Sequence, residues 1–329
     1  MDLDVVFLGT SGSAPTAQRA TSATLLRRGG DRLLIDCGEG TQRQLLRSDV
    51  GLVDLEHVFL THFHADHYLG LPGMLKTFAL RGRELPLTVY GPEGLRDLFG
   101  TLRRVFGTLT YPVETVELRP GDELDRGDYV LRAFAVDHGP QSLGYVLAES
   151  QRPGRFDVEI ADGLGVPPGR ERGMLQRGEA IVLPTGEKVA PDQVLGPARP
   201  GRTIALTGDT APAASVVDAA AGADLLVHEA TFCADERDRA RETRHSTAAE
   251  AALAAQAAGV RMLALTHVSS RYFGSEVAEE ARQVFAATVV PRDFDMIEIP
   301  FPERGSPVLV PRGARRSRGP ATAAPATEA

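Results

Sequence analysis

The chain lacks the residues that mark several classes of protein. It has no tryptophan, two cysteines and two lysines among 329 residues. Cys37 and Cys233 alone cannot build the disulfide framework of a secreted domain or a cysteine-type zinc site, so we expect a reducing, cytoplasmic setting. No basic segment precedes the first apolar run, as it would in a secretory signal. No apolar run approaches the roughly 20 residues of a membrane span, so no membrane partner is expected.

The charge balance argues against a protein that coats nucleic acid without preference. The formal net charge is −8, and such binding rests on a basic surface. A local basic patch stays compatible with this charge. The length suffices for a large core and corresponds to about two domains, although one α/β domain can be this large.

Short apolar stretches bounded by glycine or polar residues predict strands through the first half of the chain. From residue 203 onward, strands are expected to alternate with helices, which predicts sheets with helices packed outside them. The predicted strands are 3–9, 21–27, 32–38, 57–62, 85–91, 128–139, 141–150, 202–209, 223–230, 261–267 and 293–300. The predicted helices begin at Pro92 and cover 212–221, 247–258 and 275–287.

Two segments differ from this pattern. Residues 151–202 contain 9 glycines and 7 prolines, a density that breaks regular structure. Long irregular insertions in compact domains are usually functional or disordered. Residues 311–329 are poor in bulky apolar side chains, which predicts a disordered tail after a folded region of 1–310.

The stretch LTHFHADHYLG, residues 60–70, holds three of the chain's eight histidines and one aspartate. It is either a histidine-rich polar loop or half of a metal site. Alternate side chains of an extended segment face the same way, so His62 and His64 can converge on one ion. Asp66 and His67 would then serve a neighbouring ion. Imidazole and carboxylate ligands suit zinc.

Three more polar residues end apolar strands, namely His138, Asp209 and His267. Each could be structural by itself, but together with the histidine-rich stretch they complete a seven-ligand set. If Asp209 bridges, the set can hold two ions about 3.5–4 Å apart, as in phosphatases and nucleases. A water between two zinc ions would be a strong nucleophile, because zinc lowers its pKa to about 7. Two zinc ions would also make the pocket positive despite the acidic chain.

Several segments resemble the ribonuclease Z (tRNase Z) family of the metallo-β-lactamase superfamily. The stretch THFHADHYLG is similar to the signature of the whole superfamily. The narrower resemblance rests on FLGTSGSAPT (7–16), LLIDCGEGTQRQLLRS (33–48), TGDT (207–210), HEATF (228–232), RHSTAAEAA (244–252) and LTHVSSRY (265–272). It extends over about residues 3–300, nearly the whole folded chain.

The resemblance implies an α/β fold of metallo-β-lactamase type, a four-layer αβ/βα sandwich with a protruding arm, and a homodimer. It implies two zinc ions per subunit and removal of 3′ trailers from precursor tRNA, leaving a tRNA 3′-hydroxyl and a trailer 5′-phosphate. One ion would be held by His62, His64, His138 and Asp209, and the other by Asp66, His67, Asp209 and His267. Asp66 would also accept a proton from the attacking water.

Glu229 and His245 have two interpretations. Thr247 lies three residues before Glu250, the spacing of a capping box, so His245 sits on a loop just ahead of a helix. Without the family resemblance, the sequence predicts that His245 is an exposed loop residue and that Glu229 is a charged residue at the end of a strand. The resemblance implies instead that Glu229 orients His245, which protonates the leaving 3′-oxygen, a sound arrangement for general-acid catalysis.

The insertion at 151–202 occupies the place where the family carries a tRNA-binding arm. The resemblance implies substrate contacts at Gly169, Arg170, Arg172 and Arg177. Here Pro-Pro-Gly is followed by Arg170, where the family pattern has proline, and the arm as a whole is nearly neutral. Two other functions stay open: a small-molecule hydrolase such as an arylsulfatase, phosphodiesterase or thioesterase on the same scaffold, and a non-catalytic RNA-binding module without metal.

Overall fold

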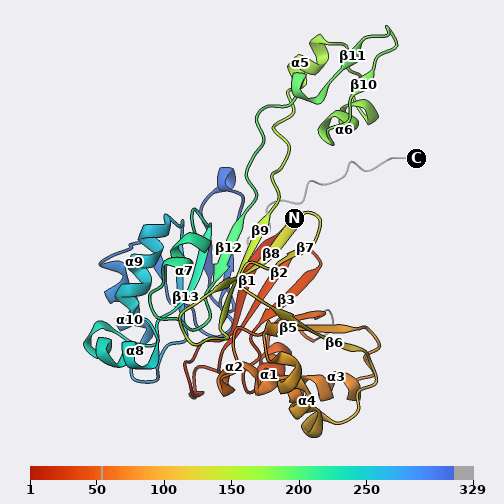
Figure 1. Ribbon diagram of the computed structural model, residues 1–329. Coiled ribbons are helices and arrows are strands. Elements are labelled where there is room, and N and C mark those ends of the chain that lie inside the picture. Colours follow the sequence, from red (N-terminus) through yellow and green to blue (C-terminus); the bar gives the residue numbers. More distant parts are fainter. Residues whose placement is uncertain (53–54, 315–329) are drawn as a thin grey trace.

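The structure is a computed structural model that describes residues 1–52 and 55–314. Most of the tail predicted to be disordered lies outside these residues. Two large sheets dominate the molecule (Figure 1). The first has the strand order β17 (Val308–Val310), β16 (Met296–Glu298), β1 (Leu3–Gly9), β2 (Ala23–Arg28), β3 (Asp31–Ile35), β4 (His57–Phe59), β5 (Leu87–Pro92) and β6 (Val113–Leu118). The second has the order β15 (Thr288–Val289), β14 (Leu263–Thr266), β13 (Leu225–Glu229), β12 (Thr203–Leu206), β9 (Leu143–Glu149), β8 (Tyr129–Ala135) and β7 (Glu123–Asp125).

The sheets pack face to face and helices cover both outer faces, which confirms the predicted four-layer αβ/βα sandwich. The layer between the sheets contains Phe7, Phe59 and Tyr145. The first sheet is covered by α1 (Thr41–Arg47), α3 (Gly70–Leu80) and α4 (Leu95–Phe106). The second is covered by α7 (Ala214–Ala219), α9 (Ala248–Ala258) and α10 (Gly274–Arg282). Among the described residues, no helix is long and apolar enough to cross a membrane.

Most of the predicted elements begin and end near their predicted limits. The helix expected from Pro92 begins at Leu95, because Pro92 is still paired with β6. The helix α10 ends at Arg282 rather than at 287. The strands missed in the two large sheets are β6, β7, β15 and β17, which are the outermost strands of those sheets. β7, β15 and β17 have only two or three residues, and β6 is interrupted by Glu114 and Glu117, so their apolar pattern is weak.

The insertion forms an arm that stands away from the sandwich (Figure 1). It contains more regular structure than its glycine and proline content predicts. Its elements are α5 (Val158–Gly163), α6 (Arg170–Gln176), β10 (Ile181–Val182) and β11 (Lys188–Val189). A small apolar core of its own, which includes Ala161, Leu175 and Val189, is separate from the cores of the sandwich.

The arm leaves and re-enters the sandwich through two adjacent segments. Arg152 pairs with Arg199, and Phe156 with Leu195, as isolated bridges between these segments. At the root, Glu149 accepts hydrogen bonds from the Arg202 side chain at 2.7 and 2.8 Å. The last residue of the arm is thereby tied to β9, the strand that precedes the arm.

Candidate metal centre

The side chains predicted as metal ligands gather at one edge of the sandwich. The strands β8, β12, β13 and β14 run in the same direction within the second sheet. His138, Asp209 and His267 follow β8, β12 and β14, so all three lie at the carboxyl ends of these strands. The first sheet supplies the loop after β4, and α2 (Ala65–Tyr68) follows that loop.

One group of donor atoms has the dimensions of a metal site. The ligand atoms of His62, His64, His138 and Asp209 lie within 4.8 Å of one another. Nε2 of His138 is 3.1 Å from Nδ1 of His64 and 3.8 Å from Oδ2 of Asp209. Ligand atoms about 2.0–2.1 Å from a tetrahedral zinc ion stand about 3.3–3.4 Å from each other. The four atoms therefore fit around a single ion.

A second group lies beside the first and consists of Asp66, His67 and His267. Nε2 of His267 is 3.2 Å from Oδ2 of Asp66 and 3.4 Å from Nε2 of His67. Oδ2 of Asp209 is 3.3 Å from Nε2 of both His67 and His267. Asp209 thus faces both groups, as a bridging ligand would.

Two buried atoms of this cluster have no hydrogen-bond partner among the described residues. They are Nε2 of His62 and Oδ1 of Asp209. An unpaired buried polar atom is costly, and buried polar groups in native proteins are nearly always satisfied. A bound cation would satisfy both atoms, so the residues fit a divalent metal.

The electrostatics of the cluster agree with a cation site. Burial raises the pKa of Asp209, but the histidines around it, His267 and His67 foremost, outweigh burial and hold that pKa well below its usual range. Burial lowers the pKa of His62, so this imidazole is neutral and able to ligate. Burial also acts to lower the pKa of His67, whereas Asp209 and Asp36 raise it well above its ordinary value. Metal binding would displace that proton, because a histidine ligand must be neutral.

Glu229 and His245 adjoin the cluster and touch each other. Oε1 of Glu229 is 2.7 Å from Nδ1 of His245, and both side chains are largely buried. Burial lowers the pKa of His245, but the charge of Glu229 and its hydrogen bond outweigh burial and raise the pKa to about 9. The predicted capping box between Thr247 and Glu250 is confirmed, and it fixes the loop that carries His245. His245 also forms a third grouping with Asp209 and His267.

Three further residues of the site were not identified from the sequence. Asp36, Thr61 and Thr231 are buried and hydrogen-bonded to the histidines of the cluster. Asp36 directly follows β3, so the rule that singled out Asp209, a polar residue ending an apolar strand, also applied to it. Neither threonine carries such a signal, because threonine is common in strands.

The predicted arm contacts lie far out on the insertion. Arg170 and Gly169 are exposed at the start of α6. Arg172 donates hydrogen bonds to the carbonyl of Val166 and forms an ion pair with Asp162, so it stabilises the arm itself. Arg177 is exposed and pairs with Glu179.

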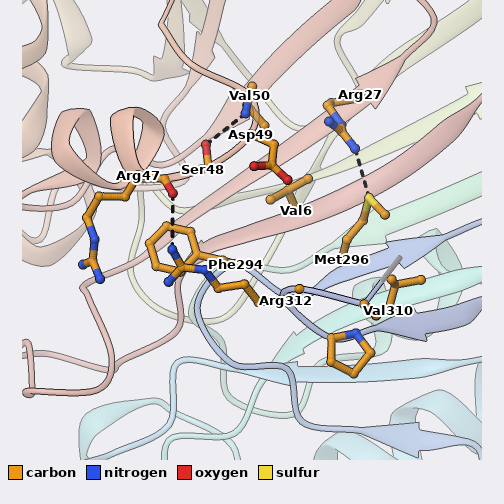
Figure 2. A pocket seen from close by; sticks show the side chains of 13 residues that line it. Val6, Arg27, Arg47, Ser48, Asp49, Val50, Phe294, Met296, Val310 and Arg312 are labelled. Atoms are coloured by element: carbon orange, nitrogen blue, oxygen red, sulfur yellow. Dashed lines mark hydrogen bonds between the residues drawn. The ribbon is translucent and has the colours of Figure 1, made fainter. Parts of the chain in front are cut away.

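A separate groove of about 500 Å³ lies beside the end of α1 (Figure 2). The guanidinium carbons of Arg47 and Arg312 lie 5.2 and 4.2 Å from the ring centre of Phe294. None of the residues that line this groove belongs to the metal cluster.

Comparison with known proteins agrees with this geometry. The model of the metallo-beta-lactamase superfamily matches residues 16–152. The fold and the histidine–aspartate cluster therefore define a metallo-β-lactamase-fold protein with a divalent-metal site. A ribonuclease Z of Natronomonas pharaonis is 50% identical over 311 residues, which cover 92% of this chain and 100% of the relative. A ribonuclease Z of Myxococcus xanthus is 46% identical over 303 residues, which cover 91% of this chain and 98% of the relative.

A solved structure gives the same result. The short form of human tRNase Z is 29% identical, covers 90% of this chain and 99% of its own, and has a TM-score of 0.66. The chain belongs to the ribonuclease Z family. The resemblance that the sequence motifs indicated is thereby confirmed.

Proposed function

We propose that this chain removes the 3′ trailer from precursor tRNA as an endoribonuclease with two zinc ions in each subunit. The observation that carries the proposal is the pair of adjacent donor groups that share Asp209, beside the buried pair Glu229–His245. Membership of the ribonuclease Z family supplies the substrate. His62, His64 and His138 would hold one ion and Asp66, His67 and His267 the other.

The metals, when bound, supply a water that ionises near neutral pH and positive charge for the phosphate. The residues of the chain move the protons. As water attacks the phosphorus, its proton passes to Asp66, whose Oδ2 is oriented by the backbone N–H of Ser13 at 2.9 Å. The bond between phosphorus and the 3′-oxygen then breaks.

The leaving 3′-oxygen takes its proton from His245. Because Nδ1 of His245 is held by Glu229, Nε2 is the nitrogen that donates. This transfer leaves a 3′-hydroxyl on the tRNA and a 5′-phosphate on the trailer. The carboxylate of Glu229 favours the protonated form of the imidazole, as a general acid requires.

The arm is the proposed contact for tRNA outside the cleavage site. It projects from the sandwich and has no residue in the metal cluster (Figure 1). Arg170 and Arg177 are its exposed candidates for phosphate contacts, and Gly169 offers backbone at the same place. A homodimer and a cytoplasmic location belong to this proposal as properties of the family.

The deciding experiment is cleavage of a precursor tRNA with a 3′ trailer by the purified, zinc-loaded protein, followed by mapping of both product ends. A single cut that leaves a 3′-hydroxyl and a 5′-phosphate is expected. An uncut transcript, combined with turnover of small esters, would favour the small-molecule hydrolase instead.

A further inference from the structure

Two buried carboxylates beside the metal centre each hold two histidines, one directly and one through a threonine. Oδ2 of Asp36 is 2.7 Å from Nδ1 of His67. Asp36 also accepts the hydroxyl of Thr61 at 3.0 Å, and the same hydroxyl oxygen is 3.0 Å from Nδ1 of His62. One carboxylate therefore reaches a proposed ligand of each ion.

Glu229 repeats this arrangement on the opposite sheet. Its Oε1 is 2.7 Å from Nδ1 of His245. Its Oε2 accepts the hydroxyl of Thr231 at 2.6 Å, and the hydroxyl oxygen is 2.9 Å from Nδ1 of His267. This carboxylate reaches a proposed metal ligand and the proposed proton donor.

The direction of these hydrogen bonds follows from the groups involved. An ionised carboxylate only accepts, so each threonine hydroxyl must give its single proton to the carboxylate. The hydroxyl oxygen can then only accept from the ring, which places a proton on Nδ1 of His62 and His267. Nε2 of both rings is left with a free lone pair, and both Nε2 atoms face Asp209.

A competing contact does not change this assignment. The hydroxyl oxygen of Thr231 is also 3.2 Å from Nδ1 of His245. That nitrogen is closer, at 2.7 Å, to the charged oxygen of Glu229, and a charge-assisted hydrogen bond is the stronger one. The accepting lone pair of Thr231 is therefore available to His267.

We propose that Thr61 and Thr231 are positioning residues that extend the hold of Asp36 and Glu229 to His62 and His267. Each hydroxyl fixes the tautomer and the ring plane of a proposed metal ligand, the task that a carboxylate usually performs by direct contact. Both threonines are almost completely buried. Gly208 has a φ of 62°, and a Cβ there would lie 2.8 Å from the Thr61 side chain, so a glycine is needed beside that threonine.

The arrangement makes Glu229 a shared support. Its loss would release both His267 and His245, whereas loss of His245 would leave His267 in place. This inference rests on the proposed metal site, but zinc binding tests it separately from RNA cleavage.

The test compares Thr61→Val and Thr231→Val with Thr61→Ser and Thr231→Ser. Valine keeps the shape and removes the hydroxyl, and serine restores it. Zinc affinity is measured by competition with a chromophoric chelator on the full-length protein, and histidine tautomers by ¹⁵N NMR. We expect each valine variant to weaken one zinc site by about 10–100-fold and the serine variants to lie within a few-fold of wild type.

Thr288→Val is the matched control. Thr288 is buried, and its hydroxyl donates to the carbonyl of Phe285 rather than to a group that holds a histidine of the cluster. Valine variants that bind zinc as tightly as wild type would overturn the proposal. An equal loss of zinc affinity in Thr288→Val would also overturn it, as would serine variants that bind zinc no better than the valine variants. If one valine variant does not fold, the zinc affinities of the other valine variant and of both serine variants still test the proposal.

Discussion

The metal centre and the arm obtain their structure from different ranges of the chain. In the metal centre, Asp66 and His267 meet although 201 residues separate them. In the arm, a continuous stretch folds on itself around its own small core. The metal centre therefore depends on the whole sandwich, whereas the arm depends on local packing and on its root. Variants in one region should leave the properties of the other intact.

The largest effect is expected for Asp209→Ala. Oδ2 of Asp209 lies 3.3–4.0 Å from ring nitrogens of the surrounding histidines, so its loss removes the proposed bridge and a charge that the cluster requires. We expect cleavage of precursor tRNA to be abolished and zinc content to fall. Protection of arm amides from hydrogen exchange should stay at the wild-type level. Cleavage above one-hundredth of the wild-type rate would contradict the bridging role.

A smaller loss is expected for His245→Ala. General-acid catalysis contributes about 10²–10⁴-fold, so the rate of the chemical step should fall by that factor. Zinc content should be unchanged, because the proposed ligand sets are complete without His245. Loss of one zinc ion in this variant would instead make His245 a ligand, in keeping with its grouping with Asp209 and His267. Single-turnover rates and metal analysis on the same preparation separate the two outcomes.

The metal centre and the arm also differ in how much of their structure could be predicted from the sequence. The residues of the candidate metal site could be predicted because they follow local patterns. Three of them, His138, Asp209 and His267, end apolar strands, and the other four lie in the histidine-rich stretch 60–70. Thr61 and Thr231 could not be predicted, because their contacts with His62 and His267 are visible only in the folded structure. The glycine and proline content set residues 151–202 apart from the rest of the sequence, but the same composition hid the short helices of this segment.

Deleting residues 155–195 tests the independence of the arm. Gly154 and Gly196 lie side by side, so joining them should not disturb the sandwich. We expect the KM for precursor tRNA to rise by at least about tenfold, the loss of roughly 1.4 kcal/mol of binding. Turnover of a small phosphodiester should be unchanged, because no arm residue belongs to the metal cluster.

The matched control for this deletion is the double variant Arg170→Ala and Arg177→Ala, which keeps the arm and removes its two exposed candidates for phosphate contact. A rise in KM similar to that of the deletion would assign the binding to these charges, and no rise would assign it to the backbone near Gly169. Equal loss of activity on both substrates after the deletion would show that the arm supports the catalytic fold.

The smallest effect on tRNA cleavage is expected at the root of the arm, in Glu149→Gln, where the change is one of stability. Burial raises the pKa of Glu149, but hydrogen bonds from Arg202 and Arg28 outweigh burial, so the pKa lies below its ordinary value. A carboxylate of this kind stabilises the fold above its unfolded pKa, and the stabilisation is lost as the pH falls through the folded value.

At pH 7, the Glu149→Gln variant should therefore unfold with a free energy about 1–3 kcal/mol lower than wild type, and the difference should narrow below about pH 4.5. Urea unfolding at several pH values measures this directly. The control is Glu123→Gln, whose exposed pair with Arg132 should contribute no more than about 1 kcal/mol. A difference between Glu149→Gln and wild type that stays constant with pH would contradict the role of the charge. Because glutamine has nearly the shape of glutamate, such a difference would mean that the lost acceptor oxygen, which Arg202 and Arg28 can no longer use, causes the whole destabilisation.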